Sequence, residues 1–141
     1  MTCPLCTGDG GEVLWRDEFC RVVLAGDADY PAFCRVILNA HIKEMSDLDV
    51  PTRDRLMAVV YAVEAALREL LNPEKINLAS LGNVMPHLHW HVIPRFGDDT
   101  HFPDPFWAAP RRAGQRHGME GLAEKLAASL RQRLSVPPET V

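Results

Sequence analysis

Histidines alternate with apolar residues in one stretch of the chain, PHLHWHVIPR, residues 86–95. The chain of 141 residues has six histidines, and half of them fall in this stretch: His87, His89 and His91. Successive side chains of a β-strand point to opposite faces, so the alternation predicts a strand whose imidazoles share one face, about 6.5–7 Å apart. The intervening residues would face a hydrophobic core; they are Leu88, Trp90 and Val92.

Two kinds of chemistry need clustered imidazoles, and this stretch alone leaves both open. Three histidines can together bind one catalytic zinc ion. Alternatively, one imidazole attacks an acyl or phosphoryl group through one ring nitrogen, while an acceptor holds the proton on the other nitrogen and fixes the tautomer. The third interpretation is a solvated histidine face on a half-exposed sheet. The three alternating positions and the apolar opposite face argue against it.

Short apolar runs and one long periodic segment precede this stretch. Residues 12–15 and 19–24 predict a β-hairpin, and residues 33–38, rich in β-branched and aromatic types, predict a further strand. Between residues 52 and 71, leucine and valine recur at steps of three and four, which predicts a long amphipathic helix. A proline suits the start of this helix, and an Asn-Pro pair suits its end.

The remaining segments predict further strands, a loop and a second helix. Residues 75–81 predict a strand that a Gly-Asn turn follows, and residues 87–93 predict the next strand, ended by a proline. Residues 97–112 are proline-rich and predict a loop. Residues 119–134 predict a helix with leucines on one face, and residues 135–141 predict a frayed tail.

This order of elements predicts a single α+β domain over residues 1–141. Its core would span about residues 3–95, and residues 96–134 would form a C-terminal loop and helix. We expect a largely antiparallel sheet on which one long central helix and the C-terminal helix pack. A sheet of this size exposes an edge strand, and the pairing of two chains would cover it.

Composition narrows the classes of partner and compartment. Fifteen Lys and Arg against nineteen Asp and Glu give a net charge of −4, so no general electrostatic attraction to nucleic acid or a membrane is expected. No segment approaches the roughly 20 apolar residues of a membrane helix, and the N-terminal segment lacks the pattern of a secretory signal. We therefore expect a cytoplasmic protein in which Cys20 and Cys34 are buried as small hydrophobes.

The segment from His87 to Ile93 matches the pattern His-φ-His-φ-His-φ-φ, with φ apolar, and so resembles the histidine-triad (HIT) family. Lys75–Asn77 and Gly82-Asn83 resemble that family's preceding strand and its glycine-containing phosphate-binding loop. Residues 35–41 resemble its LVIPKxH segment. The predicted hairpin, strand and long helix come in the family's order, so the resemblance covers roughly residues 3–95.

The resemblance implies a HIT-like α+β fold, usually homodimeric, that binds a nucleotide. Such proteins hydrolyse or transfer a nucleotidyl group at an α-phosphorus through a nucleotidyl-histidine intermediate, with dinucleoside polyphosphates or nucleoside phosphoramidates among their substrates. Carried over to this chain, His89 is the nucleophile and His91 lies near the phosphate or the scissile bond. Backbone N–H groups of the loop would bind phosphate oxygens. The residues implied in nucleotide and phosphate binding are Asn77, Gly82, Asn83, Val84 and Met85.

A Cys-x-x-Cys pair, Cys3 and Cys6, lies near the start of the chain. By itself the pair fits a redox dithiol, half of a zinc site, or two thiols without a ligand. A redox dithiol usually opens a helix, whereas the glycine-rich sequence TGDGG after Cys6 predicts a loop. A closed tetrahedral zinc site needs two more ligands, for which histidine is the expected partner.

The resemblance also implies which histidines complete such a site. The CxxC pair near the start of this chain resembles one in a zinc-bearing branch of bacterial histidine-triad proteins. That branch is related to galactose-1-phosphate uridylyltransferases. In that branch, a histidine after the strand equivalent to residues 33–39 and the first histidine of the triad complete the metal site. The implied ligands of a structural zinc ion are therefore Cys3, Cys6, His41 and His87.

Some residues depart from the family's pattern. Val84 stands where many members have Ser or Thr, so a hydroxyl that would contact phosphate is missing. Two alternative functions remain: a nucleotide-binding scaffold with little turnover, and a zinc metallohydrolase that uses all three histidines. Arg95 and Trp107 could close over the site, although sequence alone places neither there. His101 and His117, in or near the proline-rich loop, receive no role.

Overall fold

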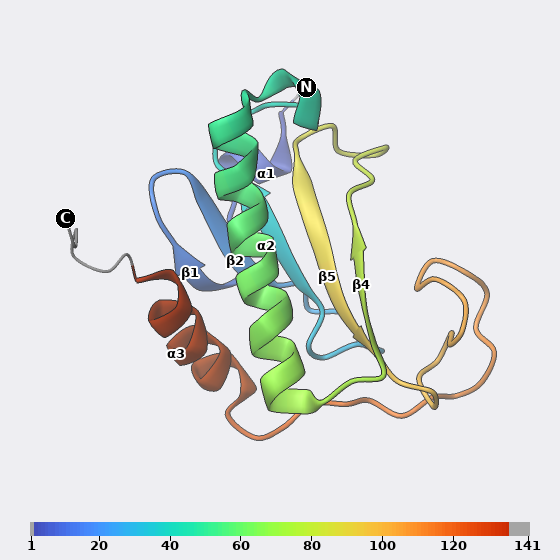
Figure 1. Cartoon of the computed structure of the whole chain (residues 1–141). Helices are drawn as coiled ribbons and strands as arrows, with labels where there is room; N and C mark the ends of the chain where they lie inside the picture. Colours follow the sequence, from blue (N-terminus) through green and yellow to red (C-terminus); the bar gives the residue numbers. More distant parts are fainter. Residues whose placement is uncertain (1, 136–141) are drawn as a thin grey trace.

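Five strands form one antiparallel sheet in the order β1-β2-β3-β5-β4 (Figure 1). The computed structural model describes residues 2–135, so the frayed tail predicted for the end of the chain lies, from residue 136 on, outside the described residues. Every pair of neighbouring strands is antiparallel, which confirms the predicted hairpin and the largely antiparallel sheet. The strands are β1 (Glu12–Arg16), β2 (Cys20–Leu24), β3 (Cys34–Leu38), β4 (Lys75–Ala79) and β5 (His89–Arg95).

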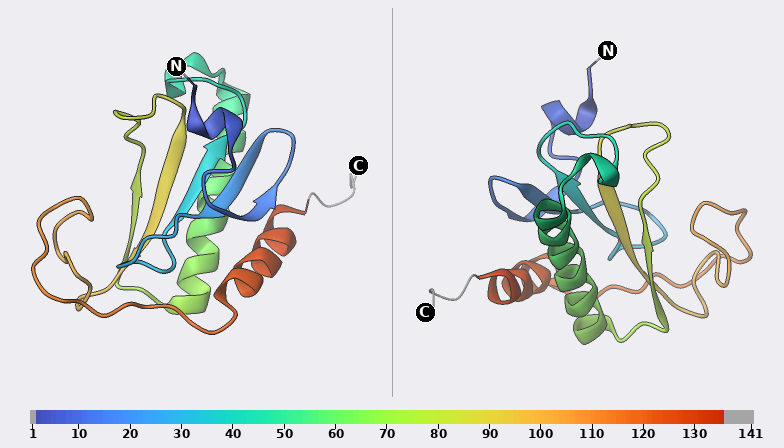
Figure 2. Two further views of the ribbon diagram at one scale, coloured as in Figure 1. Left: turned by 180° about the vertical axis from the view of Figure 1, so that it is seen from behind. Right: turned by 45° about the horizontal axis from the view of Figure 1, so that its top comes forward.

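Two helices, α2 (Val50–Leu71) and α3 (Leu122–Leu134), cover one face of the sheet (Figure 1). Seen from behind, α1 (Pro4–Thr7) lies on the opposite face, near the N-terminus (Figure 2). A short 3-10 helix, η1 (Met45–Asp47), precedes α2. This arrangement confirms the α+β fold with one long central helix and a C-terminal helix. Among residues 2–135, no helix combines the length and the apolar character needed to cross a membrane.

The central helix α2 packs one apolar stripe onto the sheet. Asp49 caps its start by accepting a hydrogen bond from the Thr52 N–H group, and Asn72 ends it in a left-handed conformation with φ 48°. The predicted period of three and four residues is confirmed, because the residues at these steps are buried: Leu56, Val59, Val60, Val63, Ala66 and Leu67.

Alternate residues of the strands face α2 and form the main core. Leu88 and Val92 are buried in that core, and Trp90 packs against it, as the alternation predicted. Cys20 and Cys34 are fully buried there as well. Burial raises the pKa of both thiols to about 12, so they behave as the small hydrophobes that the sequence predicted.

The bounds of β4, β5 and α3 differ from the predictions. β5 begins at His89 and continues through Pro94, which is tolerated because the pairing of β5 with β3 ends at Val92. β4 already ends at Ala79. α3 begins at Leu122 rather than at residue 119, because Gly121 before it has a left-handed backbone with φ 71°.

The Cys-x-x-Cys pair lies in a single helical turn, α1, and the glycine-rich segment after it is irregular from Gly8 on, as predicted. Cys3 is the N-cap residue and Pro4 the first helical residue. The turn ends where the glycine-rich segment begins, at Gly8. The helix is only four residues long, so its position depends on contacts with the sheet rather than on helix propensity.

A buried ion pair fixes the start of the proline-rich loop after β5. Arg95 Nε donates to Asp99 Oδ2 at 2.8 Å, and the two side chains are 2% and 1% exposed. Asp99 also accepts hydrogen bonds from the backbone N–H groups of Phe96, His101 and Phe102. Burial alone would raise the pKa of Asp99, but the hydrogen bonds from Arg95 and the backbone outweigh it and hold that pKa well below its usual range.

We expect Asp99→Asn to lower the free energy of unfolding by about 3 kcal/mol at pH 7, because it leaves the Arg95 charge buried without its partner. A carboxyl group with a lowered pKa in the folded state stabilises the protein fully above its unfolded pKa of about 3.9 and loses that contribution as the pH falls further. The difference in the free energy of unfolding between the variant and the wild type should therefore become smaller below about pH 4. Urea unfolding at several pH values measures both effects.

Asp104→Asn is the matched control, because Asp104 pairs with Arg111 in the same loop but at the surface. We expect this change to cost less than about 1 kcal/mol at every pH. Equal losses of unfolding free energy in the two variants would contradict a stabilising role of the buried Arg95–Asp99 pair.

Candidate functional site

Four ligand atoms meet beside the start of β5. Cys3 Sγ and Cys6 Sγ each lie 3.4 Å from His87 Nδ1, and Cys6 Sγ lies 3.3 Å from His41 Nδ1. The two imidazole nitrogens are 3.2 Å apart. All four atoms lie within 4.8 Å of one another, and this is the one such group of His, Cys, Asp or Glu found among the described residues.

These separations fit a tetrahedral zinc ion. Zn–S bonds of about 2.3 Å and Zn–N bonds of about 2.0–2.1 Å put neighbouring ligand atoms roughly 3.3–3.8 Å apart. His87 donates its Nε2–H to the Leu38 carbonyl at 2.6 Å, which leaves Nδ1 unprotonated and directed at the cluster. Two thiols and two imidazoles fill a tetrahedron, so the chain contains a candidate Cys₂His₂ metal site without an open position.

Backbone hydrogen bonds bring the two histidines of this cluster together. The Leu88 N–H group donates to the Ile42 carbonyl at 2.8 Å, and the Leu38 N–H group donates to the Leu88 carbonyl at 3.2 Å. The segment after β3 therefore runs beside the start of β5. His87 lies just before that strand, fully buried, rather than within it as predicted.

Arg21 of β2 holds the cysteine-bearing turn against the sheet. Its buried guanidinium donates to the carbonyls of Leu5, Gly8 and Asp9 at 2.7, 3.0 and 2.8 Å, and to the side chain of Asn39 at 2.9 Å. These acceptors offset the cost of burying a cation. Arg21 was not among the predicted site residues, although a charged side chain inside an apolar strand was a signal for it.

His89 is buried and held in one tautomer. Its Nδ1–H group donates to the carbonyl of His87 at 2.6 Å. A carbonyl can only accept, so Nδ1 carries the proton and Nε2 is left with a free lone pair. That is the state in which a neutral imidazole can attack an electrophile.

His91 lies beside His89, with their ring centroids 5.1 Å apart. The ring packs edge-on against Phe33 and Phe106, at 5.3 and 5.6 Å between centroids. Burial, helped by the neighbouring His89 and the Arg35 charge, lowers the pKa of His91 to about 4. Its ring is therefore neutral at pH 7, and its buried Nδ1 has no hydrogen-bond partner among the described residues.

A cavity of about 540 Å³ is lined by His89 and His91. Gly82, which has φ 70°, turns the loop of residues 81–85 so that it lines the same cavity. The backbone N–H groups of residues 82–85 donate no hydrogen bond within the part of the chain that the structure describes. Trp107 completes the lining, so four of the five predicted phosphate-binding residues and both catalytic candidates come together.

Asn77 and Arg95 lie elsewhere. The Asn77 side-chain oxygen accepts a hydrogen bond from Arg95 Nη1 at 2.8 Å, and neither residue lines the cavity of the two histidines. Arg95 is engaged by Asp99 as well, so it does not close over the site, a position that the sequence had left open. Asn77 helps to hold the proline-rich loop through Arg95.

The two histidines to which the sequence analysis gave no role both support the proline-rich loop. His101 Nδ1 lies 2.7 Å from the buried hydroxyl of Tyr30. His117 stacks on Phe96, with ring centroids 3.7 Å apart, and bonds to Asp98. Neither lines the cavity of the catalytic candidates.

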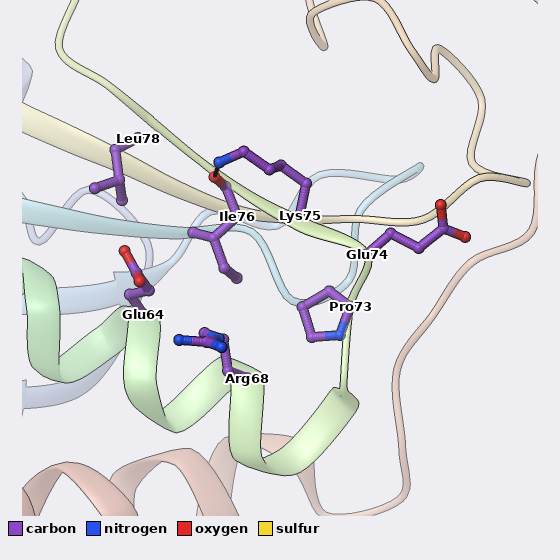
Figure 3. Close-up of a pocket in the computed structure, with 7 residues that line it drawn as sticks. All are labelled: Glu64, Arg68, Pro73, Glu74, Lys75, Ile76 and Leu78. Atoms are coloured by element: carbon purple, nitrogen blue, oxygen red, sulfur yellow. Dashed lines mark hydrogen bonds between the residues drawn. The ribbon is translucent and has the colours of Figure 1, made fainter.

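A second hollow, of about 510 Å³, lies between the end of α2 and β4 (Figure 3). Glu64 and Arg68 point from α2 toward it, and Lys75 and Ile76 approach from β4. It contains neither a histidine nor a cysteine. Its charged lining differs from that of the histidine cavity, and it borders the outer edge of the sheet.

Comparisons of sequence place the chain among known proteins. Residues 10–98 match the sequence profile of the family described as HIT domain. The AP-4-A phosphorylase of Mycobacterium tuberculosis is 26% identical over 105 residues, which cover 70% of this chain and 54% of that protein. The chain therefore spans about half the length of the curated relatives that it matches.

Solved structures of histidine triad proteins have the same fold as this chain. A histidine triad protein from Bradyrhizobium japonicum aligns with a TM-score of 0.71 and 26% identity over 89% of this chain and 92% of that chain. One from Sinorhizobium meliloti 1021 aligns with a TM-score of 0.70 and 28% identity over 89% and 91%. A Zn-bound histidine triad family protein from Mycobacterium smegmatis, 23% identical, aligns with a TM-score of 0.65 over 96% and 97%.

We expect Arg21→Met to lower the affinity of the Cys₂His₂ site for zinc roughly tenfold or more, because the turn that carries both cysteines loses its donors from β2. Competition with a chromophoric chelator measures the affinity. Arg16→Met is the matched control, since Arg16 forms only an exposed ion pair with Asp9 beside the same turn. Equal zinc affinity in both variants would contradict the positioning role.

Proposed function

The chain belongs to the HIT domain family and has the α+β HIT fold, and from this premise we propose that it is a nucleotidyl hydrolase or transferase. It would act at the α-phosphorus of a nucleotide conjugate through a covalent nucleotidyl-His89 intermediate. The observation that carries the proposal is the bond from His89 Nδ1–H to the His87 carbonyl. This bond fixes the tautomer whose Nε2 can attack, in a ring that lines a cavity.

The proposed reaction has two steps. In the first, the Nε2 lone pair of His89 forms a bond to the α-phosphorus, and the bond to the leaving group breaks with its electron pair. A phosphate leaving group departs as an anion, whereas an amine leaving group takes up a proton from solvent as the P–N bond breaks. In the second step, a water oxygen bonds to phosphorus, Nε2 recovers its electron pair, and the water's proton passes to solvent.

Two groups support binding of the phosphate. The backbone N–H groups of residues 82–85 are free of partners among the described residues, and fixed N–H donors stabilise developing negative charge. The neutral ring of His91 can add an N–H donor, because the pKa of His91 is lowered to about 4. Both would compensate for the hydroxyl that Val84 lacks.

We assign zinc a structural role. Cys3, Cys6, His41 and His87 would hold the ion in a closed tetrahedron, which ties the N-terminal turn to the strand that carries His89. A Zn-bound histidine triad family protein has the same fold. The metallohydrolase alternative is less well supported, because the candidate cluster includes His87 but neither His89 nor His91.

The substrate class rests on the relatives. One curated relative is an AP-4-A phosphorylase, so dinucleoside polyphosphates lead our proposal, with nucleoside phosphoramidates next. A nucleotide-binding scaffold with little turnover is the remaining alternative, and the missing hydroxyl at Val84 is the observation that favours it.

We also propose a homodimer formed through the β4 edge. β4 is the last strand of the sheet, so its outer backbone groups are available for a partner. Tyr61, Glu64 and Arg68 share one face of α2, and the last two line the hollow beside β4 (Figure 3). The Tyr61 side chain is 57% exposed. Opposite charges and an exposed aromatic ring on one surface suit contact with a second copy.

We expect His89→Ala to lower turnover of a dinucleoside polyphosphate by at least about a thousandfold while zinc content stays unchanged, because only the nucleophile is removed. Mass spectrometry of wild-type protein mixed with substrate should detect a nucleotidyl adduct on His89. His117→Ala, a change of a half-buried histidine outside the cavity, should leave turnover within about twofold.

The alternatives give different results in the same experiment. Full turnover in His89→Ala would falsify the covalent mechanism. A scaffold shows no turnover in the wild type on any substrate tested. A metallohydrolase loses activity on mild chelation without unfolding, and its zinc content survives the change Cys3→Ala.

We expect light scattering to give the wild type twice the mass of one chain. Tyr61→Lys should shift the protein toward the monomer, because it adds a charge at the centre of the proposed interface. Glu120→Lys, an exposed change outside α2 and β4, should not. A monomeric wild type at micromolar concentration would contradict the dimer.

A further inference from the structure

We propose that Trp107 is a specificity-determining residue, on which a planar aromatic ring of the substrate stacks. The inference deepens the proposed function and rests on it. Trp107 lines the same cavity as His89 and His91. Its side chain is 58% exposed, although indole is among the largest apolar groups and is mostly buried in folded proteins. An exposed indole that lines the cavity of the proposed nucleophile offers a flat apolar face to a ring of the substrate.

The rest of the cavity wall suits an uncharged ring. Leu81, Val84 and Met85 line it with Trp107, and none of its lining residues is an Asp, Glu, Lys or Arg. The Val84 side chain is 94% exposed. The polar groups of the cavity are the two imidazoles, the Asn83 side chain and the loop backbone, so they suit the phosphate while the apolar wall suits a ring.

The proline-rich loop fixes Trp107 relative to the histidines. Its neighbour Phe106 packs edge-on against Phe33 and His91, with ring centroids 5.1 and 5.6 Å apart. Phe106 also contacts Trp107 itself, at 5.2 Å between centroids. A continuous series of aromatic contacts therefore connects His91 on the sheet to the exposed indole of Trp107.

A buried ion pair and two further hydrogen bonds hold the loop that carries this aromatic pair. Asp99 accepts from Arg95 at the end of β5. Arg112, on the far side of the aromatic pair, donates to the carbonyls of Asp99 and Phe102 at 2.6 and 2.9 Å. The loop thus closes on itself around residues 99–112, and Trp107 is presented at its middle. This is a preformed platform, for which a ligand need not order the backbone.

Two parts of a nucleotide conjugate carry a flat ring: the nucleobase and an aromatic leaving group. Both would stack on indole by the same chemistry. Removing an aromatic stacking partner of a base weakens binding by roughly five- to 150-fold. The experiment therefore compares ligands with and without each ring.

Calorimetric titration of Trp107→Ala, Trp107→Phe and the wild type with AMP and with ribose 5-phosphate tests the nucleobase. If the base stacks, Trp107→Ala weakens AMP binding roughly tenfold, Trp107→Phe retains most of it, and ribose 5-phosphate binds all three alike. Trp15→Phe, a tryptophan outside the cavity, should bind AMP like the wild type.

Steady-state kinetics with two adenosine 5′-phosphoramidates, of tryptamine and of ethylamine, test the leaving group. If the leaving group stacks, Trp107→Ala leaves AMP binding unchanged and raises the KM for the tryptamine compound alone, with kcat little affected. Either pattern supports the proposal and names the ring that is bound. Thermal unfolding of each variant checks that the fold is intact.

The outcomes separate this inference from the proposed function. A wild type that forms the nucleotidyl-His89 adduct, with no effect of Trp107→Ala on either ligand pair, overturns the role of Trp107 alone. A wild type that forms no adduct overturns the proposed mechanism, and the AMP and ribose 5-phosphate titrations then still decide whether a ring stacks on Trp107. A wild type that binds AMP no better than ribose 5-phosphate and shows no leaving-group effect contradicts the stacking outright.

Discussion

Two hydrogen bonds from imidazoles to backbone carbonyls organise the whole site. His87 donates Nε2–H to the Leu38 carbonyl, and His89 donates Nδ1–H to the carbonyl of His87. Because a carbonyl can only accept, each bond fixes the tautomer of its ring. The first leaves Nδ1 for the Cys₂His₂ cluster, and the second leaves Nε2 for the cavity. Two histidines of one short stretch thereby receive opposite orientations and different chemistry.

Buried arginines keep the irregular segments near those histidines in place. Arg21 satisfies the carbonyls of the turn that carries Cys3 and Cys6, and Arg95 pairs with Asp99 at the root of the loop that carries Trp107. Neither segment has a strand or a long helix to order its backbone. In the first segment the Arg21 guanidinium itself replaces the missing partners of the backbone carbonyls, whereas in the second the Asp99 carboxylate, paired with Arg95, accepts from the backbone N–H groups. These side-chain contacts attach the turn with the candidate Cys₂His₂ cluster and the loop with Trp107 to the sheet.

Periodicity made most of the fold predictable. The alternation around Trp90 and the repeat from Leu56 to Leu67 each reflect burial on one face, and the structure has those faces where expected. The candidate metal ligands could also be chosen from sequence, because CxxC and the triad motif resemble a known family. The strand boundary was wrong where local pattern is weak, because β5 extends through Pro94. The binding role of Asn77 stays a prediction, and its side chain bonds to Arg95.

By itself, the sequence determined which faces are apolar, which residue types can bind zinc or attack phosphorus, and the order of strands and helices, since these follow from local spacing. The tertiary structure alone decided what those side chains meet. His41 lies 46 residues before His87, yet their nitrogens are 3.2 Å apart because the chain returns beside the end of β3. Arg95 does not line the cavity, because its guanidinium pairs with Asp99. Trp107, which follows Asp99 in the same loop, does line it. Contacts of this kind join distant segments, and no short-range pattern encodes them.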